Sequence, residues 1–213
     1  MLTLAAETRA LRQLVTQCQR RPEAEAVHEL RATARRLEVY LRLARWQVLR
    51  AELRRLIRAL GPLRDCDVAR EARLGDPFEA WRSARREAEA VKVQALLRTR
   101  EVKALIDALS VLPPLHRGKA KAVRRELEAR VSVPFEPTFE ALHAARRALR
   151  RARLARQWLS DDASELKQRQ RLMGVVCDLS CLARQLREFG AEEGAHVCER
   201  GVERLVDAFA QTT

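Results

Sequence analysis

A short basic pattern occurs twice in this chain and constrains its fold more than any other feature. Each copy has an apolar residue, a histidine, an arginine three positions later and an arginine pair seven and eight positions later. Side chains at positions 0, +3 and +7 of an α-helix lie within about 60° of one another. The pattern therefore predicts two helices that each present one histidine and two arginines on a single stripe, which suits a row of anionic groups. The stripes are His28, Arg31 and Arg35, and His143, Arg146 and Arg150.

Composition and periodicity both favour an all-α fold. The 213 residues are 47% hydrophobic but only 4% aromatic, with seven glycines and seven prolines. Apolar residues recur at intervals of three and four along the chain, whereas strands would require alternation. No apolar run is long enough to span a membrane and the N-terminus lacks the features of a signal peptide, so we expect a cytoplasmic protein with no membrane partner.

The charge balance predicts an anionic partner. Lys and Arg number 42 against 29 Asp and Glu, a net charge of +13. Arginine outnumbers lysine by 37 to 5, and its planar fork of donors binds phosphate oxygens two at a time. Nucleic acid, an acidic lipid surface and a phosphate polymer all fit this balance.

The helices expected from periodicity and capping signals divide the chain into two halves of one domain spanning 1–213. Pro113-Pro114 marks the midpoint, so the predicted repeats are 1–112 and 118–213. The expected helices cover 2–19, 22–46, 47–60, a short segment from 65 to 74, a long segment from 76 to 109 that an internal break can divide, 119–129, 138–158, 163–189 and 194–210.

A second similarity between the halves indicates an internal duplication. Gly61 and Gly174 are each followed by an apolar residue two positions later and an aspartate four positions later. When these glycines are aligned, Arg54 and Arg58 match Lys167 and Arg171. We therefore predict two tandem helical-bundle repeats with pseudo-twofold symmetry around a basic central channel, the second copy being eroded.

The first basic pattern, followed by Leu60-Gly61-x-x-Arg64-Asp65-x-Asp67-Val68, resembles the conserved-histidine α-helical domain (CHAD) family. The resemblance covers nearly the whole chain and is stronger in the first half. It implies an all-helical fold whose basic channel binds inorganic polyphosphate, and an association with polyphosphate granules or with triphosphatase domains. Cys177, at a place usually polar in the family, is one of the departures from its pattern.

The predicted polyphosphate-binding residues combine the matched motifs with the arginines that extend the two stripes. For Arg36 and Arg151, salt bridges on a solvated face are an open alternative, since both lie beside the stripe. The full set is His28, Arg31, Arg35, Arg36, Arg42, Arg54, Arg58, Arg64, His143, Arg146, Arg150, Arg151, Arg153, Lys167 and Arg171.

No metal site and no cofactor are expected. Asp65 and Asp67 are interpreted as helix-capping residues or as partners that orient Arg64, because no further acidic residues cluster with them in sequence. The five cysteines lack a Cys-x-x-Cys pair, so we expect reduced thiols. The three tryptophans are expected in the core.

Non-catalytic polyphosphate binding is the function that these features favour, with polyphosphate-metabolising proteins as further partners. One alternative is a nucleic-acid-binding helical protein, although the aromatic residues that stack on single strands are scarce. Another is an accessory module of an enzyme that processes triphosphate or polyphosphate. An enzyme is not expected, because the chain has no Gly-rich phosphate loop and Glu87-Ala88-Glu89 is followed by Lys92, one place too far for the Glu-x-Glu-x-Lys motif of triphosphate tunnel enzymes.

Overall fold

The computed structural model describes residues 2–69, 75–131 and 138–211, and the regular secondary structure of this part of the chain is all α-helical, which confirms the predicted class. Residues 70–74, at the end of one predicted helix, lie outside the described part. The helices are α1 (Leu4–Arg20), α2 (Ala24–Leu43), α3 (Gln47–Ala59), α4 (Gly61–Ala69), α5 (Asp76–Leu97), α6 (Arg100–Ser110), α7 (Arg117–Ala129), α8 (Phe139–Leu159), α9 (Ser164–Phe189) and α10 (Glu192–Gln211).

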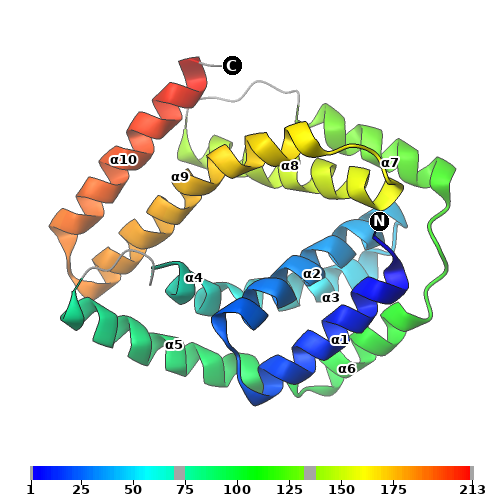
Figure 1. Cartoon of the computed structure of the whole chain (residues 1–213), viewed down its shortest axis with the longest axis horizontal. Helices are drawn as coiled ribbons and strands as arrows, with labels where there is room; N and C mark the ends of the chain where they lie inside the picture. The colour runs from blue at the N-terminus through cyan, green and yellow to red at the C-terminus, as the bar shows by residue number, and fades with distance from the viewer. Residues whose placement is uncertain (1, 70–74, 132–137, 212–213) are drawn as a thin grey trace.

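The helices α2, α4, α8 and α9 surround the centre of the molecule (Figure 1). α2 contacts α8, and α4 contacts α9, so the first and second halves of the chain meet on both sides of this central region. The other helices pack outside these four, with α1 and α3 on α2, α5 on α4, α7 on α8 and α10 on α9. The four inner helices therefore each have an apolar side toward an outer helix and a second side that faces inward.

The apolar periodicity of α2 explains why its arginines face inward. Val27, Leu30, Leu37 and Leu41 are completely buried on one side of this helix. Burying each such side chain contributes about 1.5–3 kcal/mol, so this stripe fixes the rotation of the helix about its axis. The largest core cluster contains this stripe and also takes in side chains of α7 and of the C-terminal turns of α8.

Two smaller clusters complete the ring. One joins α8, α9 and α10 through Leu142, Leu149 and Val176. The other joins α4 and α5 to α9 and α10, and in it the rings of Phe78 and Phe189 meet edge to face with centroids 5.4 Å apart.

Most predicted helix bounds differ from the observed ones by a few residues; the start of α4 differs more, and the internal break that the sequence allowed in the long segment is present. Gly61-Pro62 begins α4 rather than only ending α3, because a proline in the first turn of a helix lacks an N–H that would have no partner there. The long segment from 76 to 109 is divided into α5 and α6 at Arg98 and Thr99. None of the helices within the described residues is long and apolar enough to cross a membrane.

Candidate anion-binding cavity

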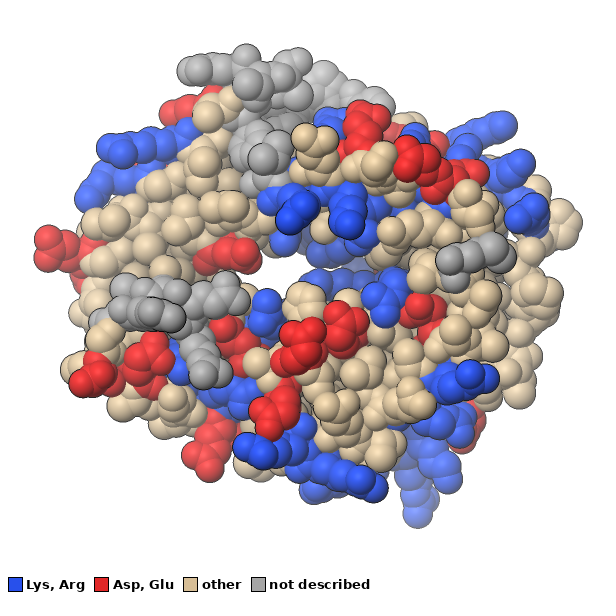
Figure 2. Space-filling model, viewed as in Figure 1, with Lys and Arg blue, Asp and Glu red and all other residues tan. Residues whose placement is uncertain are grey.

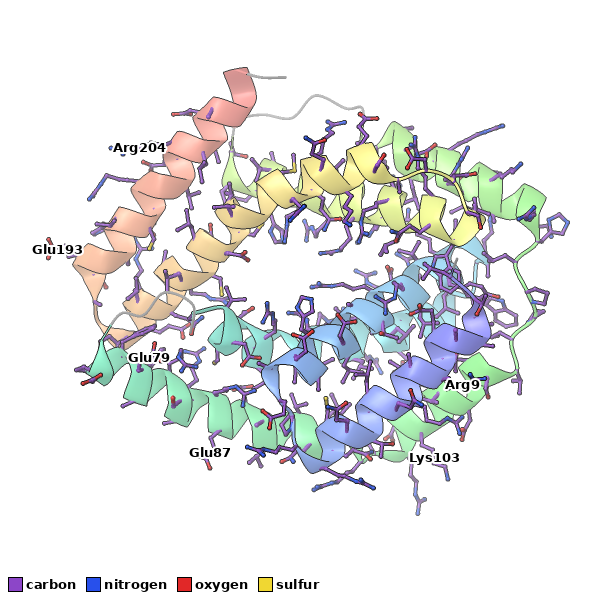
Figure 3. All side chains as sticks on the ribbon, in the orientation of Figure 1. Arg9, Glu79, Glu87, Lys103, Glu193 and Arg204 are labelled. Atoms are coloured by element: carbon purple, nitrogen blue, oxygen red, sulfur yellow. The ribbon has the colours of Figure 1, made fainter. Side chains whose placement is uncertain are left out.

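A cavity of about 1420 Å³ lies between α2, α4, α8 and α9. Figure 2 shows an opening at the centre of the molecule with basic side chains on its walls. Among the described residues, nine arginines and three aspartates line it. In Figure 3, Arg9, Glu87, Lys103, Glu193 and Arg204 lie on the outer circumference, whereas side chains of the inner helices enter the central region.

The first wall combines α2 with α4. His28, Arg31 and Arg35 all line the cavity, as their spacing predicts. Arg64 enters from α4, the helix that follows the Gly-Pro turn. The wall thus depends on the packing of α4 against α2, which brings a residue of the Gly61 motif beside the basic stripe.

The second wall is formed by α8 and α9. His143, Arg146 and Arg150 line the cavity, while Leu142 and Leu149 of the same helix are buried against α9 and α10. α9 adds residues of the second glycine motif, among them Cys177 and Asp178.

Six of the lining arginines form neither an ion pair with a carboxylate nor a side-chain hydrogen bond to an oxygen atom among the described residues, and these six are called unpaired below. Several acidic residues pair instead with arginines outside the cavity, as in the pairs Arg86–Asp67 at 2.6 Å and Arg82–Glu79 at 2.7 Å. The Nε atoms of three of the six are also buried without a hydrogen-bond partner. The unpaired arginines are Arg31, Arg35, Arg64, Arg146, Arg147 and Arg150.

Burial and the proximity of these arginines to one another disfavour the charged state of the central guanidinium groups. Burial, followed by the positive charges of Arg150 and Arg31, lowers the pKa of Arg35 to about 8. Burial and Arg146 lower the pKa of Arg150 to about 10. A lowered pKa of a cationic group means that its charge destabilises the folded protein unless an anion compensates it. The lining of the cavity therefore carries positive charge that an anionic ligand would compensate.

The two histidines differ in their surroundings. His143 has its Nδ1 atom 3.4 Å from the Sγ atom of Cys177, and its ring centroid is 5.8 Å from that of Phe139. Burial, followed by the charges of Arg147, Arg146 and Arg150, lowers the pKa of His143. His28 is nearly half exposed, with its Nε2 atom 4.0 Å from a carboxylate oxygen of Glu29.

Three other lining arginines are held by neighbours. Arg36 donates to Glu7 at 2.6 Å, and Arg153 donates to the side-chain oxygen of Gln170 at 3.0 Å. Arg184 of α9 pairs with Asp65 of α4 at 2.6 Å, which ties the two walls together. The salt bridge expected as an alternative for Arg36 is thus present: its closer partner is Glu7 of α1, and a carboxylate oxygen of Glu29 on α2 lies 4.0 Å from Nη2 of Arg36.

The sequence prediction omitted Arg147 and Arg184. Arg147 lies at position +4 from His143, and this position faces the same side of a helix as positions 0, +3 and +7. The signal for Arg147 was therefore in the sequence. Arg184 reaches the cavity only because α9 packs against α4, and the spacing along α9 carries no sign of that contact.

Six predicted residues do not line the cavity. No lining residue comes from α3, which buries Leu53 and Leu56 and leaves Arg54 and Arg58 exposed. Arg42 and Arg151 lie near Arg50, which pairs with the buried Glu38 at 2.7 Å. The residues outside the lining are Arg42, Arg54, Arg58, Arg151, Lys167 and Arg171.

Asp65 and Asp67 do not cap a helix. Both lie within α4, where Asp65 pairs with Arg184 and the buried Asp67 accepts from Arg86 at 2.6 Å. Their role is to hold α9 and α5 against α4. In the part of the chain that the structure describes, no three His, Cys, Asp or Glu side chains come together as metal ligands would.

An all-helical ring around an arginine-lined cavity defines the class of protein to which this structure belongs. The sequence model of the CHAD domain matches residues 4–162, so the chain belongs to the CHAD domain family. A search of curated proteins found no match.

Two solved structures share the fold. The CHAD domain from the plant Ricinus communis superposes with a TM-score of 0.72 at 17% identity, covering 98% of this chain and 84% of the plant chain. PptA from Streptomyces chartreusis superposes with a TM-score of 0.73 at 16% identity, covering 97% of this chain and 94% of that chain.

Proposed function

We propose that this protein binds inorganic polyphosphate in the central cavity without chemically changing it. The observation that carries this proposal is the convergence of six unpaired guanidinium groups, from three helices and both halves of the chain, on one central cavity. A polyphosphate supplies one negative charge per internal phosphate and oxygen acceptors for two-pronged arginine contacts. Binding would neutralise charges that otherwise destabilise the fold. Polyphosphate granules and the proteins that metabolise the polymer are the expected location and partners.

The placement of the two motifs supports an internal duplication with approximate twofold symmetry, which we include in the proposal. A Cβ atom placed on Gly61 would lie 3.9 Å from Nη2 of Arg31, and one on Gly174 would lie 3.7 Å from Nη2 of Arg146. Each glycine thus leaves room for the first arginine of its own half. The matched positions that line the cavity with the same residue in both halves are His28 and His143, Arg31 and Arg146, Arg35 and Arg150, and Asp65 and Asp178.

Nucleic-acid binding is the weaker candidate. Among the described residues, Phe139 is the one Phe, Tyr or Trp that lines the cavity, so successive bases would lack aromatic side chains to stack on. An accessory role beside a triphosphate- or polyphosphate-processing enzyme is compatible with polyphosphate binding, and would use the same cavity.

Titration of the purified protein with long-chain polyphosphate tests the proposal. We expect saturable binding whose affinity falls as salt is raised, because bound counterions are released. Polyphosphate should displace DNA and RNA at equal phosphate concentration. Displacement in the opposite direction, or no binding, would contradict the proposal, and release of orthophosphate in the presence of Mg²⁺ would contradict its non-catalytic character.

The affinity for polyphosphate is expected to increase as the pH is lowered from about 8 to about 6. Burial, followed by the charges of the surrounding arginines, lowers the pKa of His143 in the free protein, and a bound polyanion would offset the arginine charges and raise that pKa. Binding then takes up a proton, so a lower pH favours the complex. In the absence of ligand, a lower pH destabilises the protein. The unfolded chain takes up this proton more readily than the folded protein, so the free energy of unfolding decreases as the pH falls through the pKa of His143.

Calorimetric titration of long chains in buffers of different ionisation enthalpy measures this proton uptake. Long chains are required because their few terminal phosphates, which titrate near neutral pH, contribute little. The variant His143→Gln should take up fewer protons and bind with a flatter pH dependence. An unchanged pH dependence in this variant would exclude His143 as the group that is protonated.

A further inference from the structure

The two halves of the cavity carry equal numbers of unpaired arginines, but the arginines do not occupy matching positions. Each half supplies three. In the first half, two come from α2 and one from α4, whereas in the second half all three come from α8. The two sets are Arg31, Arg35 and Arg64, and Arg146, Arg147 and Arg150.

The difference is located at two matched pairs of positions. Three residues after the motif glycine, the first half has Arg64 and the second half has Cys177. Four residues after the histidine, the first half has Ala32 and the second half has Arg147. All four of these residues line the cavity. The second half therefore lacks a cation at one position and has an additional cation at another.

Cys177 does not replace the charge of Arg64. Its Sγ atom contacts the ring of His143, and burial raises the pKa of its thiol, so the side chain is neutral. Arg147 is exposed at the cavity wall and has no ion-pair partner among the described residues. Among the charged residues near His143, Arg147 lowers the pKa of that histidine the most, after the effect of burial.

We infer that Arg147 provides the second half of the cavity with the polyphosphate contact that Arg64 provides to the first half. This inference depends on the proposed function. In the second half the third guanidinium group comes from α8 rather than from the matched position on α9. Each half thus has three unpaired guanidinium groups for the polymer. Arg147 is then a binding residue that neither the histidine motif nor the glycine motif identifies.

Substitution of each arginine tests whether the two are equivalent. Arg147→Ala and Arg64→Ala should each weaken binding of long-chain polyphosphate about tenfold, the value expected for losing one charge-assisted contact. Arg125→Ala, which removes an exposed arginine of α7 outside the cavity, should change the affinity less than twofold, an estimate for a distant exposed charge screened by salt. Thermal unfolding of each variant verifies that it is folded.

The decisive variants restore the cation at the matched position. Arg147→Ala combined with Cys177→Arg should recover most of the lost affinity, whereas Arg147→Ala with Cys177→Gln, a neutral polar control, should not. The reciprocal pair, Arg64→Ala with Ala32→Arg, tests the other half and serves if an arginine at position 177 prevents folding.

The outcomes separate this inference from the proposed function. Polyphosphate binding by the wild-type protein together with an unchanged affinity of Arg147→Ala would overturn the inference alone. The inference would also be overturned if Cys177→Arg did not reverse the loss in Arg147→Ala and Ala32→Arg did not reverse the loss in Arg64→Ala, since the positions would not be equivalent. Absence of binding by the wild-type protein would instead overturn the proposed function.

Discussion

The double variant Arg35→Met, Arg150→Met is expected to bind polyphosphate at least about 100-fold more weakly than the wild-type protein, and yet to be more stable in the absence of ligand. Each arginine removed should cost about 1.5–3 kcal/mol of binding free energy, the range for hydrogen bonds to charged groups. The two side chains are the most electrostatically unfavourable of the cavity, as their lowered pKa values show. Replacing buried charge with apolar volume removes repulsion and desolvation cost, so the free energy of unfolding should rise by about 1 kcal/mol or more.

Calorimetric titration and thermal unfolding measure the two halves of this prediction on the same samples. The matched control is Arg12→Met on α1, which removes an exposed arginine paired with Asp107 and should change neither quantity appreciably. Weaker binding together with lower stability would mean that Arg35 and Arg150 support the fold. In that case the cavity would not be a site that holds unfavourable charge for a ligand.

The inward stripes were predictable because a helix imposes its own geometry. The spacing of His28, Arg31 and Arg35, together with the apolar residues between them, determines which side of α2 is buried and which faces the cavity. The same reasoning holds for α8. The prediction of polyphosphate binding came from the family resemblance and the charge, and no feature of helix geometry specifies that ligand.

Residues whose position depends on contacts between helices could not be placed from the sequence. Arg54 and Arg58 matched basic positions in the alignment, but α3 packs on α2 with its leucines and leaves these arginines exposed. Trp46 was expected in the core and is instead 44% exposed. α2 ends there with Arg45 in the left-handed conformation, at φ 62°, and Trp46 donates its backbone N–H to the carbonyl of Leu41. The turn that ends α2 thus directs the Trp46 side chain toward solvent, although this side chain is hydrophobic.

Trp158→Ala is expected to destabilise the protein more than any single substitution in the cavity. Trp158 of α8 is 7% exposed and belongs to the largest core cluster. Its indole Nε1–H donates to the carbonyl of Arg36 on α2 at 2.7 Å. Its ring meets that of Tyr40 edge to face at 4.9 Å, and Tyr40 donates its hydroxyl to the carbonyl of Pro113 in the linker between the halves at 2.6 Å. Removing a buried tryptophan costs about 3–5 kcal/mol.

Urea unfolding monitored by circular dichroism measures the loss, with Trp46→Ala as the matched control, because truncating that exposed tryptophan should cost no more than about 0.5 kcal/mol. Equal effects of the two substitutions would contradict the prediction.

Since Trp158 joins α8 to the carbonyl of a residue that lines the cavity, its loss should also weaken polyphosphate binding. Ligand that binds only the folded state adds about 2.7 kcal/mol at a hundred times its dissociation constant, so saturating polyphosphate should restore part of the lost stability. Recovery of this kind would show that the folded state of the variant still binds the polymer, and therefore that Trp158 supports the fold of the cavity without being required for the ligand contacts.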